Sequence, residues 1–483
     1  MAQVHRVLDE QPVPTLAAYR ALGGGAALEA ARASAPVAVI EVVEASGLRG
    51  RGGAGFPTGT KWRTVAGLGG AEPGTVVVNA AEGEPGTYKD RTILRRNPFK
   101  VLEGALIAAH AVAADRIVVG MKRSATEERA RVEAAIAEIV AEGWAQGIPI
   151  EVVAGSDRYL LGEETALLEV LVGRPPFPRI APPYRAGAEP VGPDTVSRAG
   201  TDLADPEGTS PAASTLVNNV ETLANVPAIV LDGPEAFRSL GTAESPGTIV
   251  CTVSGSTERA GVGEFELGTP LREVLAELGG APLGQQVVAV LSGTANPLLP
   301  ASALDAPLSW EGLAAAGGGL GSAGFIVIDD ETDIVAVAAG VSRFLSVESC
   351  GQCSPCKQDG EAMYAILDRA RSSAPDPRDH DRLGRLADTV TRGARCFLAT
   401  QQQLVVQSLL EHFPDALAAH VAGRADAADP YPVVPLRGIE DGQAVLGLDE
   451  LDVEPDWTVG GHDSGAAPAE RVNVRARAAS TTR

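Results

Sequence analysis

Residues 75–90 read TVVVNAAEGEPGTYKD, a β-branched run that changes abruptly into a glycine-rich acidic loop. The run at 75–79 predicts a short buried strand, because valine and threonine favour extended backbone. The glycines and the proline beyond it predict a loop directly after that strand. Since loops that follow strands are the usual ligand positions in α/β proteins, we expect a ligand to lie against this loop.

The sequence beyond this loop alternates between helical and extended patterns. Its predicted elements are a helix from Asn97-Pro98 to about Ala113, a strand at 116–120, a helix to about Glu142 and a strand at 150–153. Ser124 and Glu127 have the spacing of a capping box at the start of the second helix. Such alternation indicates an α/β fold with a mainly parallel sheet covered by helices.

The rest of the chain shows three further patterns. Residues 174–211 are rich in Pro, Gly and Ala, which predicts an extended wrapping segment. From 247 to about 330, short β-type runs surround one helix at 270–278, which predicts a separate small α+β domain. Residues 341–421 are helical in pattern and contain most of the cysteines, whereas the last fifty or so residues predict a poorly ordered extension.

Composition restricts the class of protein. With 40 Lys and Arg against 62 Asp and Glu, the net charge of −22 repels nucleic acid and anionic lipid. The most apolar stretch, 101–121, is interrupted by Glu103, His110, Asp115 and Arg116, so we expect no membrane insertion. The first ten residues lack the pattern of an export signal. We expect a cytoplasmic protein, and a peripheral position on a membrane complex stays open.

Four of the five cysteines form a ligand pattern. Cys350, Cys353 and Cys356 stand in ESCGQCSPC, and Cys396 follows in RGARCFLAT. Three closely spaced thiolates plus one remote thiolate are typical of a 4Fe-4S cluster. Zinc is the alternative, but structural zinc usually takes two pairs of ligands, which this spacing lacks. Cys251 lies outside the set, and we expect it to be a core thiol.

A second glycine-rich stretch, GLRGRGGAGFPTGTKW, occupies residues 47–62. A match to G-x-G-x-x-G is made by Gly50, Gly52 and Gly55. The preceding VAVIEVVEASG is helical in pattern, whereas a dinucleotide fingerprint follows a strand. Glycines still let backbone N–H groups approach a ligand, and positive charge for a phosphate is available from Arg49, Arg51 and Lys61. A phosphate-bearing ligand and a structural turn both stay open.

Five motifs carry a family resemblance: GLRGRGGAGFPTGTKW, NAAEGEPGTYKDR, YLLGEETALLE, VNNVETL and ESCGQCSPC. In this order, over about residues 45–400, they resemble the 51 kDa flavoprotein subunit of respiratory complex I and the related diaphorase subunits of NAD-linked hydrogenases and formate dehydrogenases. The resemblance implies a Rossmann-like FMN-binding α/β domain at 1–240, a small β-grasp (ubiquitin-like, SLBB-type) domain at 245–332 and a helical 4Fe-4S domain at 335–425. The extension is then 426–483.

The resemblance also implies roles for individual residues. By this resemblance, the residues that line the FMN site are Gly50, Arg51, Gly52, Gly53, Gly55, Lys61, Asn79, Glu82, Gly162, Glu163, Asn218 and Asn219. It places around NADH Phe56, Glu84, Tyr159 and Glu164. It assigns the cluster to Cys350, Cys353, Cys356 and Cys396. Without the resemblance, Asn218-Asn219 is typical of an ordinary turn or cap and Glu164 of a helix-start carboxylate.

The implied function is oxidation of NADH: hydride moves to FMN, and single electrons pass to the cluster and to a partner iron-sulfur subunit of a larger complex. No protein acid or base is required, since the cofactors carry the chemistry. Three positions depart from the family: Ala81 replaces the usual Asp, Leu161 the usual Cys and Ala181 a common Lys. Because of these three changes, two other functions stay open. One is an electron relay that uses FMN and the cluster but no longer NADH, and the other is a structural subunit that has kept only the metal site. NADPH, the parent complex and the final acceptor also stay open.

Overall fold

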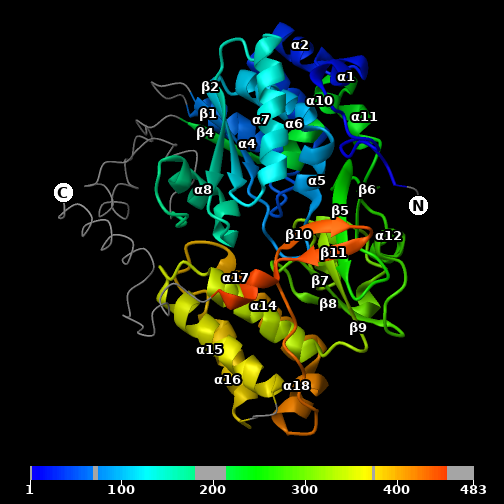
Figure 1. Cartoon of the computed structure of the whole chain (residues 1–483), viewed down its shortest axis with the longest axis vertical. Coiled ribbons are helices and arrows are strands. Elements are labelled where there is room, and N and C mark those ends of the chain that lie inside the picture. The colour runs from blue at the N-terminus through cyan, green and yellow to red at the C-terminus, as the bar shows by residue number, and fades with distance from the viewer. Residues whose placement is uncertain (1–2, 69–73, 180–213, 373–375, 454–483) are drawn as a thin grey trace, which may run out of the picture.

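The computed structural model describes residues 3–68, 74–179, 214–372 and 376–453 (Figure 1). Most of the predicted wrapping segment, Ala181 included, lies outside these ranges. The described chain contains a parallel sheet with helices, a second mixed sheet and a group of helices that follows it. Where one part ends and the next begins stays a prediction.

The first sheet has four strands, all parallel, in the order β3-β2-β1-β4. Its strands are β1 (Gly74–Ala80), β2 (Ala114–Lys122), β3 (Ile150–Gly155) and β4 (Thr215–Asn219). Residues Val76 to Val78 are fully buried, because helices cover both faces of the sheet. The predicted α/β fold with a parallel, Rossmann-like sheet is therefore confirmed.

The helices of this part begin and end at recognisable signals. They are α1 (Leu16–Ala21), α2 (Ala26–Ala33), α3 (Pro36–Ser46), α4 (Thr58–Gly67), α5 (Lys89–Arg96), α6 (Pro98–Ala111), α7 (Thr126–Ala141), α8 (Glu164–Leu171), α10 (Val220–Asp232) and α11 (Pro234–Arg238). Asn97 caps α6 by accepting the Lys100 N–H, as the Asn-Pro pair predicts. The predicted capping box of α7 is wrong: Ala125 is the N-cap, and the backbone N–H of Ser124 donates to Asp157 instead.

The second sheet has the strand order β6-β5-β9-β7-β8, in which only β5 and β9 are parallel neighbours. Its elements are β5 (Thr248–Gly255), β6 (Gly261–Glu266), α12 (Leu271–Gly279), β7 (Val287–Ser292), β8 (Leu298–Pro300), η3 (Ala301–Ala303), α13 (Trp310–Ala315) and β9 (Gly324–Asp329). Phe265, Leu271 and Phe325 lie in the core that α12 and the sheet share. The β5–β6 hairpin is followed by α12, and the last strand, β9, lies parallel beside the first strand, β5. This arrangement is a β-grasp, as predicted.

Helices follow the β-grasp. They are α14 (Ile334–Glu348), α15 (Ser354–Arg371), α16 (Asp379–Thr389), α17 (Leu398–His412) and α18 (Pro414–Val421). Their shared core includes Val341, Met363 and Val405, all fully buried. In the part of the chain that the structure describes, no helix combines the length and the apolar character that a membrane span requires.

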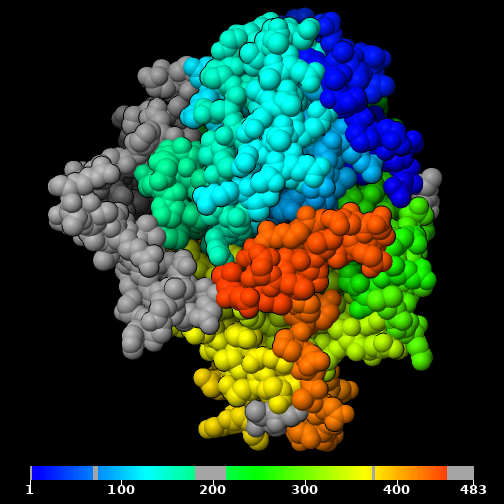
Figure 2. Space-filling model, in the orientation of Figure 1, coloured from blue at the N-terminus to red at the C-terminus, as the bar shows by residue number. Residues whose placement is uncertain are grey.

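The described part of the C-terminal extension is ordered, which corrects the prediction for residues 426–453. It forms the hairpin β10 (Leu436–Glu440) and β11 (Gln443–Leu446), followed by η4 (Leu448–Asp452). The space-filling view shows this orange to red segment on the surface where the three parts meet (Figure 2). It is held by hydrogen bonds to each part, a long-range arrangement that its Pro- and Asp-rich composition does not indicate.

Candidate functional site

The carboxyl ends of β1 and β4 meet at one edge of the parallel sheet. Asn79 and Asn219 pair directly across these two strands. The strand order shows that the chain winds to one side of β1 through β2 and β3, and returns on the other side as β4. Such a reversal marks the edge of the sheet, outside the carboxyl ends of the strands, at which ligands of α/β proteins bind, and this edge is called the crevice from here on. The loop after β1 lies at this crevice, as predicted.

The glycine loop folds back on itself. The Gly50 N–H donates to the Phe56 carbonyl at 2.8 Å. Gly55 has a φ of 63°, and a Cβ there would lie 2.4 Å from Nε1 of Trp310, so both backbone and space require glycine. Among the described residues, the backbone N–H groups of Gly52 and Gly53 meet no acceptor. These donors suit the oxygens of a phosphate-bearing ligand.

Two side chains of this loop point in opposite directions. Phe56 is 54% exposed. Arg51 is fully buried, and its guanidinium donates to the carbonyls of Pro246 and Thr248 at 3.2 and 3.1 Å. Burial lowers the Arg51 pKa to about 10. The expectation that Arg51 offers its charge to a phosphate is thereby corrected, since the guanidinium joins the loop to β5.

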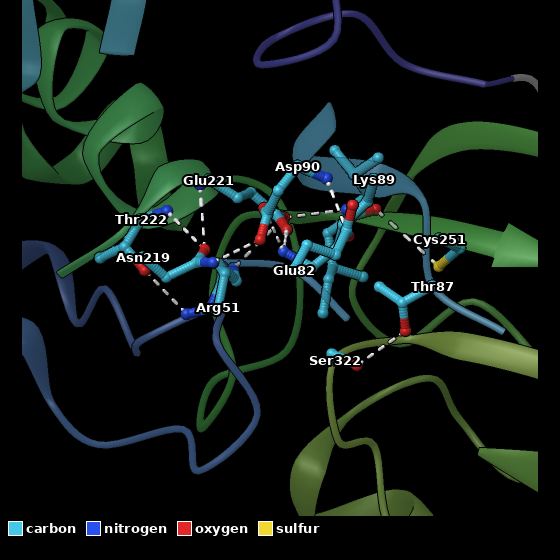
Figure 3. Close-up of polar contacts among 12 residues, drawn as sticks. Arg51, Glu82, Thr87, Lys89, Asp90, Asn219, Glu221, Thr222, Cys251 and Ser322 are labelled. Atoms are coloured by element: carbon cyan, nitrogen blue, oxygen red, sulfur yellow. Dashed lines mark hydrogen bonds and ion pairs between the residues drawn. The ribbon is translucent and has the colours of Figure 1, made fainter. Parts of the chain in front are cut away.

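A buried ion network lies beneath the crevice (Figure 3). The Lys89 ammonium lies 2.8 Å from carboxylate oxygens of both Asp90 and Glu221. Burial opposes the charge of Lys89, but these two carboxylates outweigh it and raise the lysine pKa. Asn219 Nδ2 donates to the second oxygen of Asp90 at 2.6 Å, and Arg51 lies 3.9 Å from Glu221. The network therefore joins the acidic loop, the glycine loop and the β4–α10 junction.

The three asparagines have different partners. Asn79 Nδ2 donates to the Gly162 carbonyl at 2.8 Å. Asn218 Oδ1 accepts from Nε1 of Trp62 at 2.8 Å. Asn219 Oδ1 caps α10 by accepting the Glu221 N–H at 3.0 Å. The interpretation of Asn219 as a helix cap is therefore confirmed, while Asn79 joins β1 to the turn η1 (Tyr159–Gly162).

The loop after β1 carries two partly buried carboxylates. Glu82 accepts from the backbone N–H groups of Asp90 and Arg91 at 3.1 and 3.2 Å. Burial, with the Asp90 charge adding to it, raises the Glu82 pKa to about 7. Glu84 accepts from the Thr294 N–H at 3.1 Å and the Ser322 hydroxyl at 2.5 Å, so it joins this loop to the β-grasp. Burial also raises the Glu84 pKa.

The segment after β3 brings the remaining predicted residues to the crevice. Glu163 caps α8 by accepting the Ala166 N–H at 2.8 Å. Glu164 accepts from the Lys61 ammonium at 2.5 Å, which joins α8 to α4. The Tyr159 hydroxyl accepts from Nε2 of Gln401 at 2.8 Å, and burial raises the Tyr159 pKa. Tyr159 and Glu84 are thus both engaged with protein groups.

Sequence reasoning missed Lys122, the last residue of β2. Its side chain is buried, and Nζ donates to the Asp157 carbonyl at 2.9 Å. A Cβ on Gly83 would lie 1.7 Å from this Nζ, so the acidic loop passes directly over the amine. Burial lowers the Lys122 pKa to about 8. The sequence contained a signal for this residue, because a lysine directly follows the mainly apolar run RIVVGM at the carboxyl end of a predicted strand.

The four cysteines of the pattern line one cavity in the helical part. Its other lining residues are Leu160, Ser349, Ala394, Arg395, Leu398 and Ala399. Burial raises the thiol pKa of Cys356 and Cys396 to about 12, so their thiolates require a strongly positive partner such as bound metal. Cys251 lies elsewhere, fully buried in the β-grasp core, as predicted.

The spacing of these cysteines fits a cluster better than one ion. A single zinc ion draws four thiolates to about 2.3 Å from itself, with sulfurs about 3.8 Å apart. A cubane spreads its four thiolates over four irons and needs a wider cavity. The donor set, three closely spaced cysteines and one remote cysteine in one cavity, therefore favours an iron-sulfur cluster over zinc.

One turn connects the crevice with the cysteine cavity. Leu160 lines the cavity, whereas Leu161, the next residue, packs with Ala81 and Val77 under the loop after β1. Gly162 then accepts from Asn79 at the crevice. Consecutive residues of η1 thus belong to two candidate sites, and a short protein path separates them.

Comparison with known proteins assigns both sites to a class. Residues 43–228 match the family model described as the Nuo51 FMN-binding domain. Residues 336–420 match the NADH-ubiquinone oxidoreductase-F iron-sulfur binding region. The protein is thus of the class that joins an FMN-binding domain to an iron-sulfur binding region.

Full-length relatives define the family. The chain is 36% identical over 421 residues to the second F subunit of the NADH-quinone oxidoreductase of Rhizobium meliloti, covering 85% of this chain and 95% of that one. It is 37% identical over 442 residues to the corresponding F subunit of Mycobacterium bovis, covering 88% and 95%. A crystal structure of NAD+-reducing NiFe-hydrogenase matches with a TM-score of 0.72 and 32% identity, covering 89% of this chain and 67% of that chain. The chain belongs to the family of NADH-quinone oxidoreductase F subunits.

Proposed function

We propose that this chain oxidises NADH as the flavoprotein subunit of a multi-subunit redox complex. When bound, FMN accepts hydride from NADH and the 4Fe-4S cluster conducts single electrons onward. The observation that carries the proposal is the turn η1, whose consecutive residues Leu160 and Leu161 belong to the cysteine cavity and to the floor of the crevice. A flavin in the crevice is then a short distance from the cluster.

The protein's own groups have defined tasks in this proposal. The free N–H groups of Gly52 and Gly53 and the Lys61 ammonium bind the FMN phosphate. Asn79 and Glu82 orient the flavin at the end of β1, and Gly162 allows its ring to approach the backbone. The exposed Phe56 ring stacks on the nucleotide. Other residues of the predicted FMN site hold these loops in place. They are Gly50, Gly55, Asn218, Asn219 and Glu163.

The relay that no longer uses NADH is the second candidate. It is favoured by Glu84, Tyr159 and Glu164, which the family resemblance places around NADH but which here bond to Ser322, Gln401 and Lys61. NADH binding must rearrange these contacts or use other groups. The relay would accept electrons from a protein partner.

Anaerobic absorbance distinguishes the two functions. The full-length chain is reconstituted with FMN, iron and sulfide, and its spectrum is recorded before and after NADH. Bleaching of the flavin band is the expected result. A flavin that dithionite reduces but NADH and NADPH do not would identify the relay, and a colourless zinc protein would leave only the structural role.

We further propose that electrons leave through an iron-sulfur protein partner and that the complex is cytoplasmic, with a peripheral position on a membrane where the parent complex has a membrane arm. The proposal rests on the net charge of −22 and on the family membership. Co-purification of the tagged chain from the native host, with iron analysis of the co-eluting subunits, tests it. Elution of the chain alone at its monomer mass would count against a stable partner.

A further inference from the structure

Tyr159 is fixed at three points by the helical part of the chain. Its hydroxyl accepts from Nε2 of Gln401 in α17 at 2.8 Å. Its backbone N–H donates to Oε2 of Glu348 in α14, also at 2.8 Å. Its ring meets Phe344 of α14 edge-on, with centroids 5.4 Å apart. The first residue of η1 is therefore attached to both α14 and α17.

Both anchors of Tyr159 adjoin the cysteine cavity. Glu348 lies two residues before Cys350 in the sequence, and Ser349 between them lines the cavity. Gln401 lies five residues after Cys396, and Leu398 and Ala399 between them line the same cavity. Metal ligation by these cysteines fixes the end of α14 and the start of α17, where the two anchors lie.

Among the residues that the structure describes, the Gln401 amide has a single hydrogen-bond partner, the Tyr159 hydroxyl. It is 5% exposed, and its Oε1 is buried without a hydrogen bond among the described residues. The Tyr159 hydroxyl is thus the group that holds this amide. Removal of the hydroxyl leaves a buried amide without any partner, which is unfavourable and lets the α17–η1 contact open.

The other end of η1 reaches the crevice. Leu161 packs with Ala81, and the Gly162 carbonyl accepts from Asn79. Glu163 and Glu164 follow directly, the latter bonded to Lys61. The four residues of η1, Tyr159 to Gly162, form a single 3-10 turn, which transmits a displacement of its first residue to its last.

From this connection we propose that Gln401 is a positioning residue which, through the Tyr159 hydroxyl, couples cluster insertion to FMN binding. The inference rests on the proposed function. A chain with its cluster holds η1 in the geometry of the crevice and binds FMN tightly. A chain without it releases α17 and η1 and binds FMN more weakly. Because coupling between two sites is reciprocal, bound FMN also raises the affinity of the chain for the cluster by the same factor.

The test compares FMN binding to the full-length chain with its cluster and after anaerobic removal of the cluster by a chelator. The dissociation constant is measured by quenching of FMN fluorescence, and folding is checked by circular dichroism. The wild-type constant is expected to rise about tenfold on cluster removal, about the effect of one hydrogen bond to a buried group. Y159F and Q401L should lower this ratio, which stays above one because both variants keep the contacts of residue 159 with Glu348 and Phe344.

A matched control lies on the same helix. Gln403 donates to the Ala387 carbonyl of α16 at 2.7 Å, and among the described residues no hydrogen bond joins its side chain to η1. Q403L therefore loses a comparable hydrogen bond but should keep the wild-type ratio. A merely structural role of Gln401 would weaken FMN equally with and without the cluster and leave the ratio unchanged.

The outcomes separate two failures. Two results overturn the coupling while the proposed function stands. In one, the wild-type chain binds FMN tightly and its dissociation constant is the same with and without the cluster. In the other, Y159F and Q401L keep the wild-type ratio of the two constants. No FMN binding to either form of the wild-type chain overturns the proposed function and the coupling with it. Should Q401L fail to fold, Y159F decides alone, because it keeps the ring that packs on Phe344.

Discussion

The Lys61 ammonium of α4 lies 2.5 Å from a carboxylate oxygen of Glu164 in α8, although 103 residues separate them in the sequence. Both border the crevice, and Glu164 is partly exposed. In the proposed FMN site, the phosphate competes with Glu164 for this ammonium, because a compact point charge is shared among the anions around it. The ion pair therefore makes binding of the cofactor and the position of α8 interdependent.

Replacing Lys61 tests this relationship. We expect K61M to weaken FMN binding about tenfold, since a charge-assisted contact to phosphate contributes about 1.5–3 kcal/mol. E164Q should tighten FMN binding slightly, because it leaves the ammonium to the phosphate alone. Fluorescence titration measures both effects. R63M is the matched control, since Arg63 also lies on α4 but pairs with Glu44. An FMN affinity that K61M leaves at the wild-type value would remove Lys61 from the site.

The cysteine cavity makes a prediction about composition. C356S should lose most of the bound iron and acid-labile sulfide, because serine is a poor substitute for a thiolate ligand. C251S should retain both, since Cys251 lies in the core of the β-grasp. Iron and sulfide analysis after identical reconstitution measures the difference. Equal iron content in the two variants would contradict the assignment of the cavity.

The local pattern of the sequence predicted much of this architecture. The run at 75–79, the asparagine cap of α6 and the short strands of the β-grasp each follow from neighbours within a few residues. The cysteines were assigned from spacing alone, and the structure brings all four to one cavity. A local rule failed where a tertiary contact competed with it. Asp157 accepts from the backbone N–H of Ser124, and the predicted capping box does not form.

Contacts between distant residues explain most of what was missed. Asp90 and Asn219 are 129 residues apart, and the buried network that they share also uses Glu221, two residues after Asn219 in the motif VNNVETL. Nothing in the local pattern shows that Arg51 turns inward or that Gln401 meets Tyr159. Such partners depend on how three parts of the chain pack, which periodicity and spacing do not contain.

The raised Glu82 pKa makes a prediction about pH. Its folded value of about 7, against an ordinary value of 4.5, means that the folded chain holds a proton which the unfolded chain releases in this window. The contribution of Glu82 to stability is therefore present below about pH 4.5 and is lost as pH rises through about 7. Relative to wild type, E82Q should gain stability as pH rises across this window.

Denaturant unfolding of wild type and E82Q at several pH values measures this difference. E127Q is the control, since Glu127 is largely exposed at the surface. A difference between E82Q and wild type that stays constant across the window would show that Glu82 is charged throughout.

Gly55 tests the glycine loop. G55A should destabilise the chain by about 2–4 kcal/mol, because a Cβ meets the Trp310 ring in addition to the cost of a positive φ. G143A isolates the backbone effect: Gly143 has a φ of 76° and open space around its Cβ position, so about 1 kcal/mol is expected. Denaturant unfolding compares the two. Equal losses would mean that the loop moves away from Trp310 without cost.

Arg91 tests whether the C-terminal hairpin supports the crevice. Its guanidinium donates to the carbonyls of Leu436 in β10 and Glu82 in the acidic loop, at 3.0 and 3.3 Å. R91M leaves both carbonyls without this donor, and we expect a loss of about 2–3 kcal/mol. Because the hairpin then detaches more often, limited proteolysis should cut faster near residue 426, and FMN affinity should fall with it. The matched control is R371M, since Arg371 also donates to the C-terminal segment, at Ala428, but among the described residues has no hydrogen bond or ion pair with the acidic loop. Faster cleavage in both variants with weaker FMN binding only in R91M is the result that a supporting role requires, whereas unchanged FMN affinity in R91M would reduce the hairpin to a surface attachment.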